Sequence, residues 1–389
     1  MLIAILIRCT FLIYLKSNVN LPNDDRVTNF NETVIKYFKK RKLSTLFFCY
    51  LSSSVFANER LYLKQAEILE NKTIDGKSVK LISGDIVFKK GDLTLNCENG
   101  IQYVLDDLAI LYDGIYATQN ERKMTCDTIK FFSNNNILHG IGNSHVWDID
   151  YNLAADSITI FTEIDSGIAA GNVTLIQKGQ IINSDRIKYK REKGKKGVSY
   201  TAIGNVIIKD SSIIAKCGKA TYSHLDRNTT LEINPQINES ERILSGERIF
   251  LSYENEKLKE LHIPQKANVI TIEKGYQKSV TDSMKLGDSL NLKNKIEGKK
   301  LVSFFNNGKI DSIRIEGMAK TLYHVFKDSI YQGNNNVSGD TITMSFLDNE
   351  LNTINILGGS EGEYFPDSVA NKIKLPIIYK ANKIQYQLM

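Results

Sequence analysis

The stretch Gly171-Asn172-Val173-Thr174-Leu175-Ile176, followed by Ser184-Asp185-Arg186-Ile187-Lys188-Tyr189 and then by Gly204-Asn205-Val206-Ile207-Ile208, decides the fold of this chain. Each run is rich in β-branched and aromatic residues, and Gly, Asn and Asp punctuate the runs, which is typical of short β-strands joined by turns. Helical periodicity is nearly absent after residue 58. The chain has only 5 Pro, so little interrupts a continuous sheet. The sequence therefore predicts an all-β body.

The same two-strand unit recurs along the chain. A small residue is found at Cys97, Cys126, Ala155, Ser184 and Cys217, and a glycine lies 12 or 13 positions upstream of each, at Gly84, Gly114, Gly142, Gly171 and Gly204. Three further units of strand, polar turn, strand and Gly follow after residue 240. A unit of this size cannot bury one face alone, so neighbouring units must stack to form a core. We expect the small residue to lie where the sheet folds over or where layers approach closely.

The cysteines fit this small-residue position. Cys97, Cys126 and Cys217 stand where other units have Ala155 and Ser184, so we interpret them as compact buried residues. A disulfide between Cys97 and Cys126 in adjacent units is left open. Neither a Cys-x-x-Cys pair nor a suitably spaced His accompanies them, so we expect no metal site and no cofactor.

Composition and charge exclude several classes of protein. The chain has 389 residues, of which 42% are hydrophobic and 24% are charged, which is too apolar for a disordered chain. The net charge is +6, but residues 1–57 hold 8 Lys or Arg and 3 Asp or Glu, so the rest is close to neutral. A nucleic-acid-binding surface is therefore not expected.

The first 57 residues have the pattern of an export leader. The basic run Lys39-Lys40-Arg41-Lys42 precedes a short apolar stretch that ends at Ser54-Val55-Phe56-Ala57, which is typical of a signal peptide cleaved after Ala57. For the residues upstream, two interpretations remain open. Translation begins near Val34, or residues 1–15 form a retained membrane anchor. Both place the body outside the cytoplasm.

A search for catalytic groups finds none. Asp127, Asp156 and Asp185 recur at one position of the repeat, so we interpret them as turn or strand-entry residues rather than as a general acid and base. His139 and His145 are interpreted as turn and strand-surface residues. The basic run Lys188–Lys196 either contacts an anionic sugar or phosphate or is a solvated loop, and we favour the loop. The chain is not expected to be an enzyme.

The repeat resembles the OstA/LptA family of periplasmic lipopolysaccharide-transport proteins, also known from the organic-solvent-tolerance N-terminal domain. The resemblance rests on Gly171-Asn172-Val173, Ser184–Tyr189 and Gly204-Asn205-Val206 in the first units. In the later units it rests on Val337–Ile342 and Ile315–Ala319. Together the similar units cover about residues 60–365.

The resemblance implies a β-jellyroll folded over like a taco, whose rungs are stacked antiparallel strands. It also implies an apolar groove that shelters the acyl chains of lipid A, and sheet ends that pair edge to edge with other family modules, with a head-to-tail oligomer as one outcome. Unpaired strand edges are suited to such pairing. From the alternation along the strands, we expect the groove to be lined by Ile129, Phe131, Ile158, Ile160, Val173, Leu175, Ile187, Tyr189, Val206 and Ile208.

The expected organisation is a leader (1–57), a first β-jellyroll domain (58–240), a second β repeat segment (241–365) and a C-terminal tail (366–389). The expected role is a lipid carrier and bridge in lipopolysaccharide transport and outer-membrane assembly, in the periplasm or on the periplasmic side of the outer membrane. Two other functions remain open. One is a structural or adhesive surface β-solenoid without lipid. The other is a solenoid enzyme acting on polysaccharide, which would need unique clustered carboxylates outside the repeat register.

Overall fold

The computed structural model describes residues 60–387, except 192–196, 211–212, 240, 280–285, 349 and 371–373. The predicted leader lies outside the described residues, so its signal peptide and its anchor stay predictions. In the part of the chain that is described, no helix is long and apolar enough to cross a membrane.

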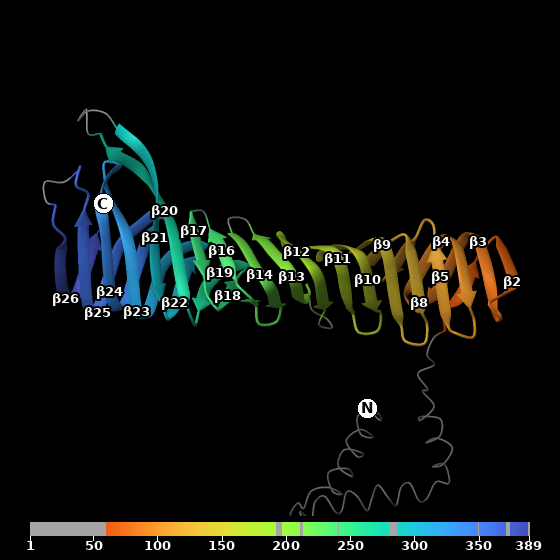
Figure 1. Ribbon diagram of the computed structural model, residues 1–389. Coiled ribbons are helices and arrows are strands. Elements are labelled where there is room, and N and C mark those ends of the chain that lie inside the picture. The colour runs from red at the N-terminus through yellow and green to blue at the C-terminus, as the bar shows by residue number, and fades with distance from the viewer. Residues whose placement is uncertain are drawn as a thin grey trace, which may run out of the picture. The chain divides into compact units, whose positions relative to one another are not determined.

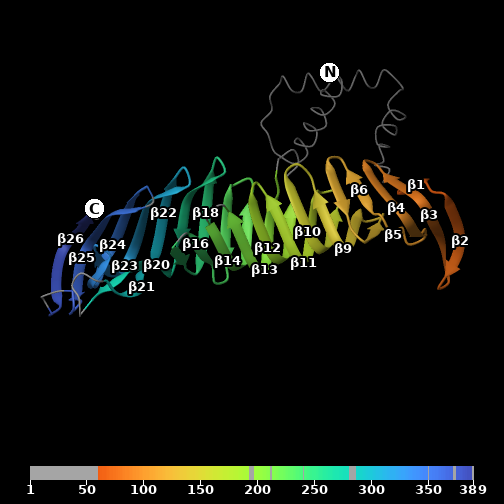
Figure 2. The ribbon, with the colours of Figure 1, turned by 90° about the horizontal axis from the view of Figure 1, so that it is seen from above.

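The described residues form β-strands that follow one another in chain order from one end of a stack to the other (Figures 1 and 2). The prediction of an all-β, repeat-built fold is confirmed. The strands are β1 (Tyr62–Gln65), β2 (Ile68–Ile74), β3 (Lys77–Lys90), β4 (Leu93–Tyr103), β5 (Leu108–Tyr112), β6 (Tyr116–Gln119), β7 (Arg122–Thr125), β8 (Thr128–Phe132), β9 (Ile137–Trp147), β10 (Tyr151–Phe161), β11 (Ser166–Gln177), β12 (Gln180–Lys190), β13 (Ser199–Asp210), β14 (Ile213–Ser223), β15 (Asn228–Glu232), β16 (Gln236–Glu239), β17 (Arg242–Ser245), β18 (Arg248–Glu254), β19 (Lys257–Ile263), β20 (Ala267–Lys278), β21 (Leu286–Gly298), β22 (Lys300–Asn306), β23 (Lys309–Lys327), β24 (Ile330–Leu347), β25 (Glu350–Pro366) and β26 (Ile377–Gln387).

The long strands bend in the middle, at the repeated Gly-Asn pair. In β11 the pairing with β12 is regular on both sides, but the register shifts between Ala170 and Val173. Gly171 and Asn172 lie in this gap with φ angles of +77° and +48°. This left-handed region favours glycine and tolerates asparagine, which explains why the pair recurs. The sequence suggested that Gly171 starts a strand. The structure shows instead that it bends one continuous strand, as in a β-bulge.

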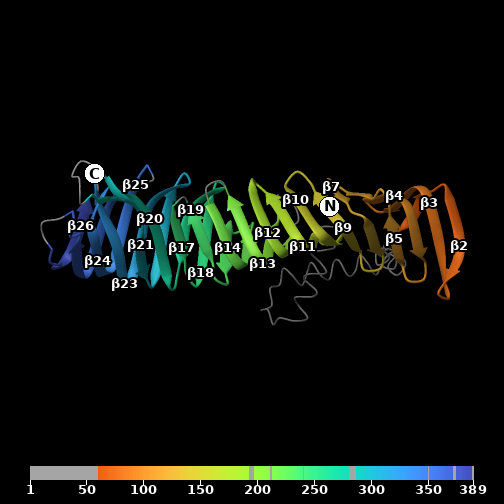
Figure 3. The same cartoon turned by 45° about the horizontal axis from the view of Figure 1, so that its top comes forward.

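These bends divide the strands into two layers. The first layer contains residues 128–132, 137–141, 157–161, 166–170, 186–190, 199–203 and 219–223 with their neighbours, and the second contains residues 122–125, 144–147, 151–155, 173–177, 180–184, 206–210 and 213–217 with theirs. The line of bends is called the spine here. The opposite side, where the hairpin turns of the two layers meet, is called the seam. Figure 3 shows the tilted strands of the stack from an oblique view. The folded-over arrangement that the sequence suggested is confirmed.

The inner faces of the two layers form one hydrophobic core along the stack, from Ile82 in β3 to Ile356 in β25. Side chains alternate along each strand, so that Val173 and Leu175 point inward while Asn172 is exposed. Small residues allow the layers to approach. A Cβ atom on Gly140 of the first layer would lie 3.3 Å from the sulfur of Cys126 and 3.2 Å from the hydroxyl of Ser144.

Strand pairing continues across the boundary that was expected after residue 240, which itself lies outside the described residues. The hairpin strands β16 and β17 on either side of that residue pair with each other, and β15 pairs with β18. Residues 366–389, expected as a C-terminal tail, contain β26, which pairs with β25. Among the described strands, β2 pairs only with β3 and β26 only with β25, so both ends of the stack present a free edge.

Candidate functional site

All ten residues predicted to line the groove point into the interior. Their exposed fractions lie between 0% and 7%, and they belong to one core. Ile129, Phe131, Ile158, Ile160, Ile187 and Tyr189 come from the first layer, and Val173, Leu175, Val206 and Ile208 come from the second. The two layers therefore enclose an apolar interior, and the alternation along the strands placed these ten side chains on its inner faces; that they line a groove for lipid stays a prediction.

The repeated Asp residues build the spine. The side chain of Asn172 donates hydrogen bonds to both carboxylate oxygens of Asp156, and Asn143 and Asn205 do the same to Asp127 and Asp185. These carboxylates are held by the bends on the outside of the molecule. The interpretation as turn or strand-entry residues fits Asp127, which lies between β7 and β8, but Asp156 and Asp185 lie inside the continuous strands β10 and β12, at the bend.

The small residue of each unit lies next to this corner. Cys97 and Cys217 are buried and Cys126 is half-buried, and all three are free thiols, so the disulfide that the sequence left open does not form. Burial raises the pKa of the Cys97 and Cys126 thiols to about 12 and that of Cys217 to about 11. A thiol in this state is a poor nucleophile and metal ligand at neutral pH.

The histidines do not assemble into a site. His139 and His145 lie on opposite sides of the bend in β9, and their rings contact Thr159 at 2.8 Å and Asn152 at 2.7 Å. Within the described residues, no group of three or more His, Cys, Asp or Glu could hold a metal ion.

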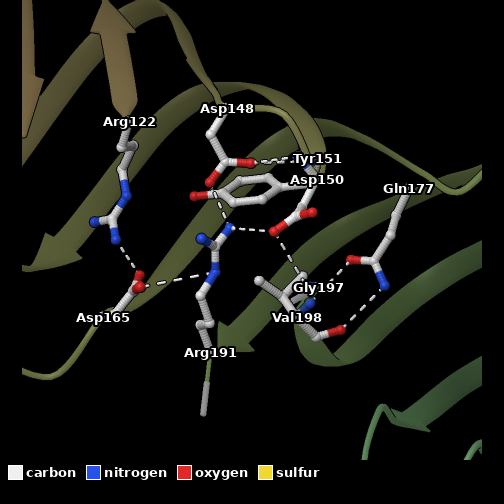
Figure 4. A network of polar contacts seen from close by, with 9 residues as sticks. All are labelled: Arg122, Asp148, Asp150, Tyr151, Asp165, Gln177, Arg191, Gly197 and Val198. Atoms are coloured by element: carbon white, nitrogen blue, oxygen red, sulfur yellow. Dashed lines mark hydrogen bonds and ion pairs between the residues drawn. The ribbon is translucent and has the colours of Figure 1, made fainter. Parts of the chain in front are cut away.

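A cluster of charges bridges the seam in the middle of the stack (Figure 4). Arg191, at the end of β12 in the first layer, forms an ion pair with Asp148 in the turn of the second layer, and it lies 3.7 Å from Asp150. Asp148 is 2% exposed, so this pair is nearly withdrawn from water. The carboxylate of Asp148 also accepts hydrogen bonds from the backbone N–H groups of Asp150 and Tyr151 in its own turn.

A second guanidinium crosses the seam in the opposite direction. Arg122, at the start of β7 in the second layer, pairs with Asp165 in a turn of the first layer, and Asp165 also lies 3.7 Å from Nε of Arg191. Beside them the Gln177 amide donates to the Val198 carbonyl at 3.2 Å and accepts from the Val198 N–H at 3.3 Å. We call Arg122, Asp148, Asp150, Asp165 and Arg191 the latch cluster.

Basic side chains lie over aromatic rings of the opposite layer at three levels of the seam. The distances to the ring centroids are 5.8 Å for Lys90 over Phe131, 5.4 Å for Arg191 over Tyr151 and 4.9 Å for Arg242 over Phe346. Each cation–π contact adds of order 0.5–2 kcal/mol when it is partly desolvated. The seam is thus closed by polar and cation–π contacts above an apolar interior.

Several buried donors in the latch cluster and among the tyrosines of the core lack hydrogen-bond partners. They are Nε and Nη1 of Arg122, Nε of Arg191 and the hydroxyls of Tyr151, Tyr189 and Tyr200. Burial raises the pKa of all three tyrosines, so their hydroxyls stay protonated. Further along the seam, a cavity of about 460 Å³ opens between Lys178 and Tyr222.

The seam residues were missed by the sequence reasoning. Residues 192–196 of the basic run that was interpreted as a solvated loop lie outside the described residues. Arg191 of the same run is 19% exposed and forms ion pairs with Asp148, Asp150 and Asp165, whereas Lys188 is exposed as expected. A charged residue at a strand end has no periodic signal. Only the meeting of two turns that are far apart in sequence reveals its partner.

Comparison with known proteins confirms the resemblance over part of the chain. Residues 154–257 match the family described as LptA/(LptD N-terminal domain) LPS transport protein. No curated protein matches the chain. Among solved structures, LptH, described as the LptA homologous periplasmic component of the lipopolysaccharide transport device of Pseudomonas aeruginosa, is 14% identical, with a TM-score of 0.26. That match covers 28% of this chain and 79% of LptH. At the level of the family, the match of residues 154–257 supports a role in lipopolysaccharide transport.

Proposed function

We propose that this protein is a periplasmic lipid carrier and bridge that shelters the acyl chains of lipopolysaccharide between its two layers during outer-membrane assembly. The observation that carries the proposal is the set of ten inward-facing residues, contributed by both layers and joined in one apolar core along the stack. Burial of apolar surface is worth about 25 cal/mol per Å², so acyl chains placed there are strongly favoured over water. Such a carrier needs no catalytic group.

Edge-to-edge pairing is the second part of the proposal. The free strands β2 and β26 carry exposed apolar side chains, among them Ile68, at 54% exposure, and Ile378, at 70%. An edge strand of this kind offers unpaired backbone groups to a further strand. Another module of the same family, or a second copy of this chain, therefore extends the stack at either end.

Photo-crosslinking tests the carrier function. The exported protein is expressed in a Gram-negative host with a photoreactive amino acid at Val173, Ile187 or Val206. Lys188 is the control, because it neighbours Ile187 on β12 and points outward. Adducts with lipopolysaccharide at the three interior positions and not at Lys188 are the expected result.

One observation favours a second candidate, a structural or adhesive surface β-solenoid without lipid. The interior residues are nearly inaccessible to water, as in a closed and packed core. The absence of adducts at every interior position of a well-folded protein would establish this alternative. Crosslinking from Ile378 to a second β module would test edge pairing separately.

A further inference from the structure

The latch cluster consists of charged side chains that are largely buried at the seam. It places two guanidiniums and three carboxylates at the rim of an apolar core, and Arg122 is only 11% exposed. Charges in such a place cost desolvation free energy that their pairing only partly offsets, so an apolar pair of the same size would close the seam at least as firmly. Stability alone does not account for them.

The composition of the cluster argues against a site for a bound anion. Three carboxylates face two guanidiniums, so the cluster has no surplus of positive charge. Three of the four ion pairs of the cluster join the first layer to the second, and the fourth, between Arg191 and Asp165, lies in the turns of the first layer at the seam. The charges are arranged to bind one another across the seam.

The free-energy cost of opening the seam depends on which groups become exposed to water. An ion pair that separates at the seam exposes both partners to solvent, which hydrates them and repays part of the lost attraction. A hydrophobic closure would expose apolar surface when it opens. Polar closure of an apolar interior is therefore suited to reversible opening.

We infer that the latch cluster is a releasable lateral gate, whose ion pairs hold the two layers together at the level of β9 to β13 and whose release parts the seam to admit acyl chains sideways. The spine is the hinge, since the bends at Gly142, Gly171 and Gly204 leave the two halves of each strand joined by a short bulge. This inference rests on the proposed function for its cargo, but the opening itself is a property of the chain.

A second, more exposed ion pair crosses the seam near the latch cluster. Lys178 of the second layer pairs with Glu256 of the first at 2.7 Å, with both side chains well exposed. A cavity of about 460 Å³ lies directly beside this pair, and Tyr222 and Tyr253 line it from the first layer.

The direct test measures the seam without any ligand. Spin labels are placed at Ile181→Cys and Lys188→Cys, two outward positions on β12 that lie in different layers, in a background without the native cysteines. Arg191→Met should lengthen or broaden the distance distribution relative to the unsubstituted cluster. The matched control is Lys219→Met, because Lys219 pairs with Glu232 at 2.7 Å within the first layer and does not cross the seam. An unchanged distribution in folded Arg191→Met would overturn the gate.

A lock keeps the test decisive if Arg191→Met fails to fold. Lys178→Cys and Glu256→Cys are joined by a cleavable bismaleimide across the seam, and the photoreactive residue is placed at Ile187. The lock should reduce lipopolysaccharide adducts several-fold, and cleavage should restore them. Equal yields with the lock closed and cleaved would contradict lateral entry. Loss of adducts in every variant, with a distance change in Arg191→Met, would reject the carrier function and leave the gate standing.

Discussion

Asn172 donates its side-chain amide to both carboxylate oxygens of Asp156, at 3.2 and 2.9 Å, across the bend that joins the two layers. Both residues are exposed, and both belong to long strands that change layer at this point. The same pair recurs one unit before and one unit after. The hydrogen bonds from the asparagine hold each carboxylate at the spine, where it has a structural role.

Removing the Asp156 carboxylate should lower stability by about 0.5–1.5 kcal/mol, the usual worth of an exposed hydrogen-bonded group. Urea unfolding of Asp156→Ala, Asn172→Gly and the double variant measures the coupling in a double-mutant cycle, and Gly keeps the left-handed backbone of Asn172. Losses that simply add would show that the two side chains do not act together.

The bend at Gly171 should not tolerate a side chain. Gly171→Ala forces alanine into a left-handed backbone, at a cost of about 1–3 kcal/mol, and would place Cβ 2.9 Å from Cγ of Asp156. Gly179→Ala is the matched control, because Gly179 has a similar φ of +81° but no heavy atom lies within 4 Å of its Cβ position. The free energy of unfolding should fall further in Gly171→Ala than in Gly179→Ala, by about 1–3 kcal/mol, because only the first substitution brings Cβ too close to Asp156. Equal losses would mean that the corner can relax.

The three thiols should resist alkylation in the folded protein. Their pKa values, raised by burial to about 11–12, leave almost no thiolate at pH 8, and ordinary labelling should appear only after unfolding. The pKa of these thiols is higher in the folded protein than the unfolded value of about 9. Their contribution to the free energy of unfolding is therefore fully present below pH 9 and is lost as the pH rises toward 12. Peptide mass spectrometry of maleimide-treated protein checks the first point. Rapid labelling of Cys97 in the native state would disagree with its burial.

Tyr200→Phe should leave stability unchanged or raise it. The Tyr200 hydroxyl is buried and has no hydrogen-bond partner, and an unsatisfied buried donor costs about 1–3 kcal/mol. In contrast, Tyr379→Phe should lose about 0.5–1.5 kcal/mol, because its hydroxyl donates to Asn335 Oδ1 at 2.7 Å. Thermal or urea unfolding compares the two. A clear loss in Tyr200→Phe would reveal a partner such as an ordered water.

Much of the fold follows from local pattern. The strand content, the stacking of units and the inward residues all depend on alternation and on a repeat, which are properties of neighbouring residues. Val173, Ile187 and Val206 could therefore be assigned to the interior before their surroundings were known. The mid-strand position of Gly171 was not predictable in this way, because glycine in a turn and glycine in a bulge have the same sequence signature.

The sequence by itself determined that this chain is a β repeat whose small residues and glycines recur at one place in each of the first five units, with Asp127, Asp156 and Asp185 at a shared position in three of them. Only the tertiary structure decided which turns meet. Arg191 and Asp148 are 43 residues apart, and Arg122 and Asp165 are equally distant. Their pairing depends on how each strand bends at the spine and returns to the seam. No local rule encodes that meeting, since it results from the register of several strands acting together.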